Sequence, residues 1–136
     1  MNVLVPLAEG FEEIEAITII DTLRRASIPV TTAGLQETQV TGSHNITVTA
    51  DTTLDTALQS AFDMIILPGG MPGSKHLSDD PRVIDMIQQI NSDNGYVAAI
   101  CAAPMALGKA GVLKGKNATC FPGVEEKMTG ASHSTD

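Results

Sequence analysis

The chain has 136 residues, of which 43% are hydrophobic, and this suits one globular domain with its own core. Its formal net charge of −8 argues against nucleic acid or an anionic membrane as a partner, because both would repel it. The sequence opens on a strand-like run without a basic leader and has no apolar run of transmembrane length, so we expect a cytoplasmic protein. Two cysteines are too few for a disulfide framework and are expected to be thiols.

The first part of the chain predicts a β-α-β unit followed by a hairpin. Residues 2–7 form an unalternated apolar run, which is typical of a central strand, and residues 28–34 form a second, β-branched strand. Between them, large apolar residues recur at helical spacing over residues 12–26 and predict a helix with one buried face. These residues are Ile14, Ile17, Ile20 and Leu23. Alternation of polar and apolar residues over 39–50 indicates a short hairpin.

The second part of the chain continues the alternation of strand and helix. Residues 61–67 predict a buried strand, which the Pro- and Gly-rich loop 68–73 ends abruptly. A helix is expected over residues 80–95, opened by an aspartate cap and a first-position proline. A weak strand over 118–120 and a short polar helix over 124–128 follow. This order predicts an α/β fold, with a doubly wound, mostly parallel sheet and helices on both faces.

Cys101 lies at the corner between a predicted strand over 97–100 and a helix that begins at Pro104. The unalternated apolar residues of this strand predict burial on both faces. Sharp strand-turn-helix corners expose reactive side chains, and the unpaired N–H groups of a helix N-terminus stabilise a thiolate, so we expect a lowered thiol pKa. A free cysteine is also often a small buried hydrophobe, and the residues alone leave both interpretations open.

Backbone donors and one carboxylate are expected to meet Cys101, because the carboxyl ends of parallel strands share one edge of the sheet. Gly69 and Gly70 follow the strand over 61–67, and Ala102 follows the cysteine, so their N–H groups could form an oxyanion hole. Glu15, if buried and protonated, could donate a hydrogen bond to the thiolate or its oxidised form. The alternatives are a simple tight turn at the glycines and a first-turn acid that interacts with the helix dipole.

Three motifs carry a resemblance to a known family. Residues 8–16, 67–70 and 98–104 together resemble the ThiJ/PfpI family, in particular the branch of the parkinsonism-associated protein deglycase and bacterial YajL. The resemblance covers the whole chain. It implies a flavodoxin-like sandwich, a homodimer, and no metal or other cofactor.

The resemblance also assigns roles to residues. It makes Cys101 the reactive cysteine, Glu15 the acid that hydrogen-bonds it, and Gly70 and Ala102 the backbone donors beside it. It places Gly69, Phe121 and His44 at the pocket, so that the candidate site has seven members. They are Cys101, Glu15, Gly69, Gly70, Ala102, Phe121 and His44.

The chain departs from the family pattern at several points. Ala102 stands where protease-like members have a histidine, Phe121 where one branch has a histidine near the thiol, and His44 where some relatives have an arginine at the pocket rim. The family chain also continues with another strand and helix. We therefore expect residues 1–136 to be a single domain without that unit, and the missing piece to bind as a complementary C-terminal fragment.

Two functional hypotheses from different classes use the same atoms. The first is a cofactor-free enzyme of glyoxalase or deglycase type, in which Cys101 attacks a small reactive carbonyl substrate. The second is a redox sensor or stress chaperone that acts through oxidation of Cys101. A cysteine peptidase is the third hypothesis, because no histidine follows the cysteine.

Overall fold

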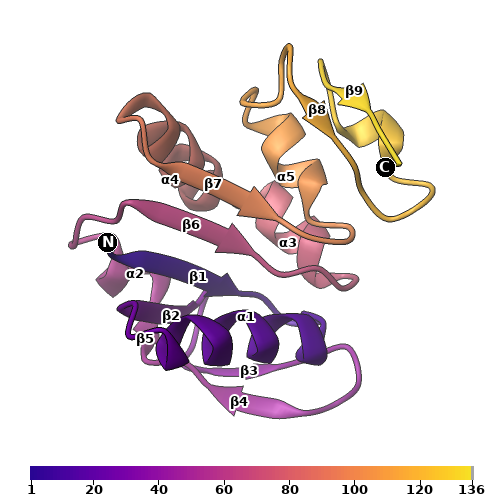
Figure 1. Cartoon of the computed structure of the whole chain (residues 1–136). Helices are drawn as coiled ribbons and strands as arrows, with labels where there is room; N and C mark the ends of the chain where they lie inside the picture. The colour runs from indigo at the N-terminus through magenta and orange to yellow at the C-terminus, as the bar shows by residue number, and fades with distance from the viewer. Residues whose placement is uncertain (136) are drawn as a thin grey trace.

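Five parallel strands form the central sheet of the protein, in the order β5-β2-β1-β6-β7 (Figure 1). A computed structural model describes residues 1–135. The strands of this sheet are β1 (Val3–Leu7), β2 (Val30–Gly34), β5 (Thr52–Thr53), β6 (Met64–Leu67) and β7 (Tyr96–Ala99). β1 is central, and the chain adds strands first on one side of it and then on the other. This is the predicted parallel sheet.

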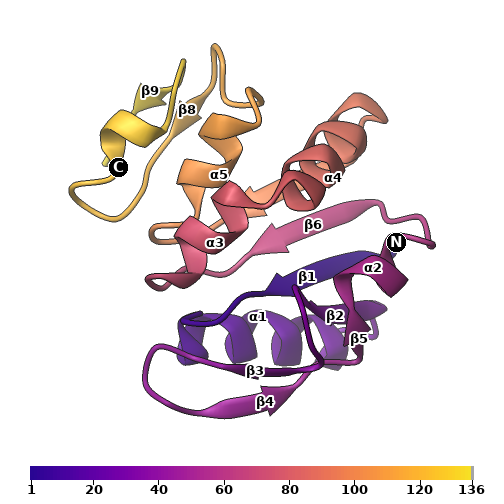
Figure 2. The same cartoon turned by 180° about the vertical axis from the view of Figure 1, so that it is seen from behind.

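Helices cover both faces of the sheet, as predicted (Figures 1 and 2). One face carries α1 (Glu13–Arg25), and the other carries α2 (Leu54–Ala57), α3 (Gly73–Asp79), α4 (Pro81–Ser92) and α5 (Pro104–Lys109). β1 contributes to both cores because successive side chains alternate: Val3 and Val5 pack on the α1 side, and Leu4 on the other. Among the described residues, no helix is long and apolar enough to cross a membrane.

Two small strand pairs complete the fold. β3 (Gln39–Thr41) and β4 (Thr47–Thr49) form the predicted antiparallel hairpin. β8 (Asn117–Ala118) and β9 (Ser132–His133) pair in parallel, with the 3-10 helix η1 (Glu125–Lys127) between them in sequence. β8 thus ends before the strand expected over 118–120 does, and η1 is shorter than the helix expected over 124–128.

The strand before Cys101 is less buried than its sequence predicts. β7 pairs with β6 and forms one edge of the five-stranded sheet in residues 1–135. Tyr96 is 61% exposed, Val97 to Ala99 are half-buried, and Ile100 is 46% exposed. The prediction of burial on both faces was wrong because an apolar run predicts a strand but not its position in the sheet.

The face of α1 that packs on the sheet also differs from the predicted one. Ile14 and Ile17 are 75% and 47% exposed, whereas Glu13, Ala16 and Ile20 are buried. The helix is turned so that the Glu13 carboxylate reaches backbone donors in the loop between β3 and β4. These hydrogen bonds offset the burial of a charge and leave two isoleucines in solvent.

The start of α4 is held by one aspartate, as the sequence predicts, and the same residue follows α3, a helix that was not predicted from the sequence. Asp80 caps α4 by accepting a hydrogen bond of 2.9 Å from the Arg82 backbone N–H, and its carboxylate pairs with the Arg82 guanidinium at 2.6 Å. Burial would raise the pKa of Asp80, but the hydrogen bonds and charge of Arg82 hold that pKa below its ordinary value. Arg82 also donates to the carbonyl of Leu35 at 2.9 Å and ties α4 to the end of β2.

Candidate active site

Cys101 occupies the sharp turn between β7 and α5. Its φ is +62°, a left-handed conformation that is rare and strained for a residue with a side chain. The turn is fixed on both sides: the Ile100 N–H donates to the Leu67 carbonyl at 3.2 Å, and the Phe121 N–H donates to the Cys101 carbonyl. The thiol is half-buried. This is the strand-turn-helix corner predicted from the sequence.

Two backbone N–H groups face the sulfur of Cys101. They belong to Ala102, the next residue, and to Gly70. The φ of Gly70 is +96°, a backbone conformation that only glycine adopts at low energetic cost. A Cβ at Gly70 would also lie 2.7 Å from the carbonyl oxygen of Gly10. The structure therefore brings together the two donors proposed for an oxyanion hole.

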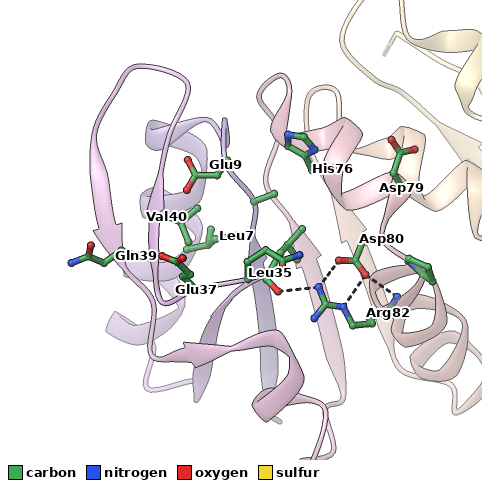
Figure 3. A pocket seen from close by; sticks show the side chains of 13 residues that line it. Leu7, Glu9, Leu35, Glu37, Gln39, Val40, His76, Asp79, Asp80 and Arg82 are labelled. Atoms are coloured by element: carbon green, nitrogen blue, oxygen red, sulfur yellow. Dashed lines mark hydrogen bonds and ion pairs between the residues drawn. The ribbon is translucent and has the colours of Figure 1, made fainter.

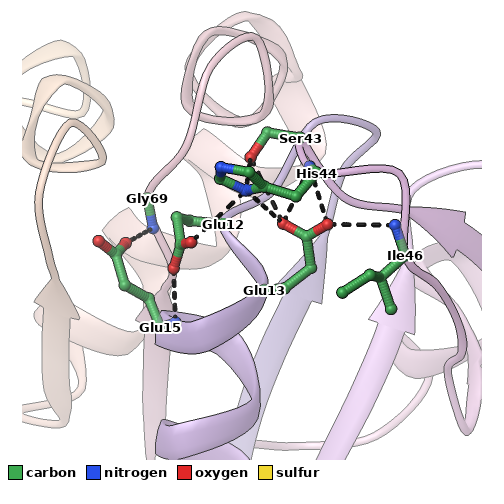
Figure 4. Close-up of polar contacts among 7 residues, drawn as sticks. All are labelled: Glu12, Glu13, Glu15, Ser43, His44, Ile46 and Gly69. Carbon is green, nitrogen blue, oxygen red and sulfur yellow. Dashed lines mark hydrogen bonds and ion pairs between the residues drawn. The ribbon is translucent and has the colours of Figure 1, made fainter.

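Glu15 lies between the glycine loop and the cysteine. Its Oε1 accepts a hydrogen bond of 2.9 Å from the Gly69 N–H, and its carboxylate accepts one from the Cys101 thiol (Figure 4 shows the Gly69 contact). A Cβ at Gly69 would lie 2.5 Å from Glu15 Oε1 and 2.7 Å from the Cys101 Cβ. Only a glycine allows this close approach.

The acidity of Cys101 differs from the sequence prediction. Burial raises the pKa of the thiol, and the ionised Glu15 raises it further through charge repulsion and as a hydrogen-bond acceptor. The N–H groups of Ala102 and Gly70 lower the pKa, but by less. With Glu15 ionised the thiol pKa thus lies above its ordinary value, and the prediction of a lowered pKa was wrong for that charge state. The prediction had counted Glu15 as a hydrogen-bond donor and had left out the negative charge of its carboxylate.

His44 lies in a polar cluster with Glu13 rather than in contact with the thiol (Figure 4). Its Nδ1 is 3.1 Å from Glu13 Oε1 and 3.2 Å from Ser43 Oγ, and its side chain is 70% exposed. Both neighbours approach the same ring nitrogen, whereas a serine-histidine-acid relay needs them on opposite nitrogens. The cluster is therefore not a catalytic triad.

Phe121 is placed beside Cys101 by its backbone. Its N–H donates to the Cys101 carbonyl, while its side chain is 56% exposed. Of the seven residues predicted for the site, the structure brings Cys101 together with the two glycines, Glu15 and Ala102. It places Phe121 at the turn and His44 on the neighbouring carboxylates.

Glu13 is the residue that sequence reasoning missed. Its carboxylate accepts hydrogen bonds from the backbone N–H groups of His44 at 2.8 Å and Ile46 at 3.2 Å. Burial acts to raise its pKa, but its own backbone N–H, these donors and the His44 side chain hold the pKa below its ordinary value. The one signal in the sequence was an acid at a position that helical spacing would bury.

Glu12, Glu13 and His44 also form a group that could be considered for a metal ion. Their ligand atoms lie within 4.8 Å of one another. However, Glu13 already accepts from protein donors, and Glu12 accepts from the Glu15 N–H at 2.8 Å as the cap of α1. These carboxylates are satisfied by the protein itself, so the group gives no reason to assign a metal.

A cysteine on a strand-to-helix corner of a doubly wound sheet, flanked by a carboxylate and backbone donors, defines a class of α/β proteins with a half-buried thiol at the carboxyl edge of the sheet. Comparison with known families gives a match to the DJ-1/PfpI family over residues 1–136. The chain belongs to this family.

Individual relatives support the assignment. The chain is 41% identical to the protein DJ-1beta of Drosophila melanogaster over 128 residues, covering 93% of this chain and 68% of that protein. The crystal structure of Drosophila DJ-1beta superposes with a TM-score of 0.94 at 39% identity, over 99% of this chain and 74% of that one.

Other relatives differ more in length or sequence. The DJ-1 homolog A of Arabidopsis thaliana is 44% identical over 93% of this chain, and the chain spans only about a third (33%) of its length. A Pyrococcus abyssi protein named as a deglycase is 32% identical, over 96% of this chain and 78% of that protein.

Replacing Glu15 by glutamine is expected to lower the pKa of Cys101. The substitution removes the negative charge beside the sulfur, so the thiolate forms at lower pH and alkylates faster at a fixed pH below the wild-type pKa. Iodoacetamide alkylation across a pH series, read by peptide mass spectrometry, separates Cys101 from Cys120. Glu126→Gln is the charge-matched control. An equal or higher pKa in Glu15→Gln would contradict this account of the site.

Gly70→Ala is expected to lose more stability than Gly123→Ala. The two glycines have nearly the same φ, +96° and +99°, so the backbone strain is matched. A Cβ at Gly123 meets nothing within 4 Å, whereas one at Gly70 meets the backbone of Gly10 and Glu12. We expect Gly123→Ala to reduce the free energy of unfolding by about 1 kcal/mol and Gly70→Ala by at least about 1 kcal/mol more. Urea unfolding measures both free energies. Equal losses of stability in the two variants would show that the loop at Gly70 accommodates the added Cβ at little energetic cost.

Proposed function

We propose that this protein is a cofactor-free, cysteine-dependent enzyme that acts on small reactive carbonyls, such as methylglyoxal or early glycation adducts. The observation that supports this most is the joint position of Cys101, Glu15 and the two N–H groups of Gly70 and Ala102. Such a set provides a nucleophile, a proton acceptor and an oxyanion hole within one crevice. The relative from Pyrococcus abyssi is named as a deglycase, which agrees with the proposal.

The proposed reaction begins with addition of Cys101 to the aldehyde carbon of methylglyoxal. The S–C bond forms as the carbonyl π electrons move to oxygen, and the N–H groups of Gly70 and Ala102 stabilise that oxygen. Glu15 takes the thiol proton and passes it to that oxygen, which gives the hemithioacetal. Glu15 then carries the proton of the aldehyde carbon to the neighbouring carbon while the hydroxyl proton moves to the neighbouring oxygen, so that the hemithioacetal becomes a lactoyl thioester. Water hydrolyses the thioester, releases lactate and restores the thiol.

The raised thiol pKa shapes the first step. Because Cys101 keeps its proton while Glu15 is ionised, the proton must leave as the S–C bond forms. Glu15 already accepts a hydrogen bond from that thiol and is the adjacent acceptor. The carboxylate that raises the thiol pKa thus also serves as the base that removes the proton.

A redox sensor or stress chaperone is the second candidate. A thiolate at Cys101 would attack a peroxide to give sulfenate with loss of water or alcohol, and a second peroxide would give sulfinate, whose oxygens the same N–H groups could hold. A solved relative from Toxoplasma gondii is described as oxidised DJ-1, over 96% of this chain. Two free cysteines suit a reducing compartment, which supports the expected cytoplasmic location. The peptidase hypothesis stays third, because Ala102 follows the cysteine.

Product-resolved turnover of methylglyoxal separates the two candidates. The wild type is expected to form lactate over many turnovers, Cys101→Ser to form none, and Glu15→Gln to be slower by about a hundredfold because proton transfer is lost. Glu126→Gln is the control, together with buffer thiol alone. In Glu15→Gln, Cys101 should be alkylated faster whereas methylglyoxal should turn over more slowly, so the rates in the two assays change in opposite directions. Stoichiometric loss of methylglyoxal without lactate would support the sensor instead.

A second copy of this chain is the protein partner that we propose, in line with the homodimer that the resemblance implies. Two isoleucines on α1 remain in solvent, Ile14 at 75% and Ile17 at 47% exposure. Adjacent apolar side chains on one helix are typical of an interaction surface.

Negative charge introduced on this side of α1 is expected to dissociate the dimer. We expect wild type to sediment at twice the chain mass, and the double variant Ile14→Glu, Ile17→Glu to sediment as a monomer. Tyr96→Glu, at a residue 61% exposed on the edge strand, is the matched control and should remain dimeric. A monomeric wild type, or a dimeric double variant, would show that this surface is not the interface.

A further inference from the structure

A cavity of about 710 Å³ opens at the carboxyl edge of the sheet, apart from the cysteine site. It lies between the segments after β1 and β2 on one side and the junction of α3 and α4 on the other (Figure 3). Cys101, Glu15 and Gly70 are not among its lining residues. Its volume falls within the roughly 300 to 1,000 Å³ usual for small-molecule sites, and the edge is where α/β sheets bind ligands.

The floor of this cavity is hydrocarbon. Leu7, Ala8, Leu35 and Val40 line it, and each of these residues is no more than 9% exposed. They belong to the core or its margin, so the floor is fixed before any ligand arrives. An aliphatic stem placed here would exchange water for carbon contacts.

The positive charge at the wall of the cavity is already neutralised. Arg82 donates to Asp80 at 2.6 Å, to Asp55 at 2.9 Å and to the Leu35 carbonyl at 2.9 Å. These hydrogen bonds use the guanidinium to connect α4 to neighbouring segments, and the carboxylates of Asp80 and Asp55 balance its charge. Arg82 therefore offers an anionic ligand no open cationic partner.

Two carboxylates at the rim remain available. Glu9 accepts the Thr41 N–H at 3.2 and 3.3 Å, which positions it without neutralising it, and Glu37 has no hydrogen bond or ion pair within residues 1–135. By contrast, Asp79 on the opposite wall pairs with Lys75 at 2.6 Å. Figure 3 shows Glu9 and Glu37 on the same wall of the cavity.

We propose that this cavity binds a small organic cation, an aliphatic primary ammonium whose stem lies on the Leu7 and Val40 floor and whose charge meets Glu9 and Glu37. The apolar floor distinguishes it from a site for a bare metal ion, which would need several converging oxygen ligands. The same ammonium chemistry is offered by a free polyamine and by a lysine side chain of a peptide. The proposal is independent of the carbonyl chemistry at Cys101.

The test is a titration of the full chain with spermidine and, separately, with Nα-acetyl-lysine amide, followed by calorimetry and amide NMR shifts. We expect saturable binding, with shifts centred on residues 7–9 and 35–40. The double variant Glu9→Gln, Glu37→Gln should bind at least about fivefold more weakly, because two exposed charge contacts are lost. Fully acetylated spermidine, which has no charge, should not bind.

Charge-matched controls separate this site from general attraction to an acidic protein. Asp85→Asn with Glu126→Gln removes the same charge from exposed positions elsewhere and should leave the affinity unchanged. Cys101→Ser should also bind normally, so failure of the proposed enzyme activity and failure of this site are distinguishable. Tighter binding of one probe assigns the source of the ammonium. Non-saturable binding, shifts centred elsewhere, or equal weakening by both double variants would overturn the proposal.

Discussion

The close contact of the loop after β6 with the cysteine corner and α1 is the constraint on which the site depends. The Gly69 N–H donates to Glu15 at 2.9 Å, and the Gly69 carbonyl accepts from the Glu12 N–H at 2.9 Å. A side chain at Gly69 would overlap both Glu15 and Cys101. One residue, Gly69, therefore sets the position of the helix that carries the acid relative to the corner that carries the thiol. A loop that could move away would let the Glu15 carboxylate turn into solvent, away from the sulfur.

Two acidic residues on α1, Glu13 and Glu15, bind different neighbouring segments. Residues two positions apart on a helix point about 200° apart, so Glu13 and Glu15 cannot serve the same neighbour. Glu13 meets the β3–β4 loop through the N–H groups of His44 and Ile46, and Glu15 meets Gly69 and Cys101. With both directions set by hydrogen bonds, Ile14 and Ile17 are left facing outward. Polar contacts, rather than the apolar stripe, thus determine the rotation of α1.

Local patterns allowed much of the fold and the cysteine corner to be predicted, and the family resemblance assigned the other candidate site residues their roles. Alternation of strand and helix gave the parallel sheet, and the elbow pattern gave the corner at Cys101, which the φ of +62° confirms. The errors arose where a property depends on distant partners. The exposure of β7 depends on which strands pair beside it, and the pKa of Cys101 depends on Glu15, more than eighty residues away along the chain. Neither relation leaves a periodic signal in the sequence.

The segment after β1 separates two different environments at the same sheet edge. Glu9, at its start, lines the acidic cavity, and three residues later Glu12 caps α1 beside the glycine loop. Gly10 lies between them: its N–H donates to the Thr41 carbonyl at 2.9 Å, and its carbonyl accepts from the Gly73 N–H at 3.3 Å. On one side, two rim carboxylates favour positive charge; on the other, the N–H groups of Gly70 and Ala102 partly offset the effect of Glu15 on the thiol. Because backbone hydrogen bonds hold the boundary at Gly10, the side chains on either side can differ in charge without disturbing each other's geometry.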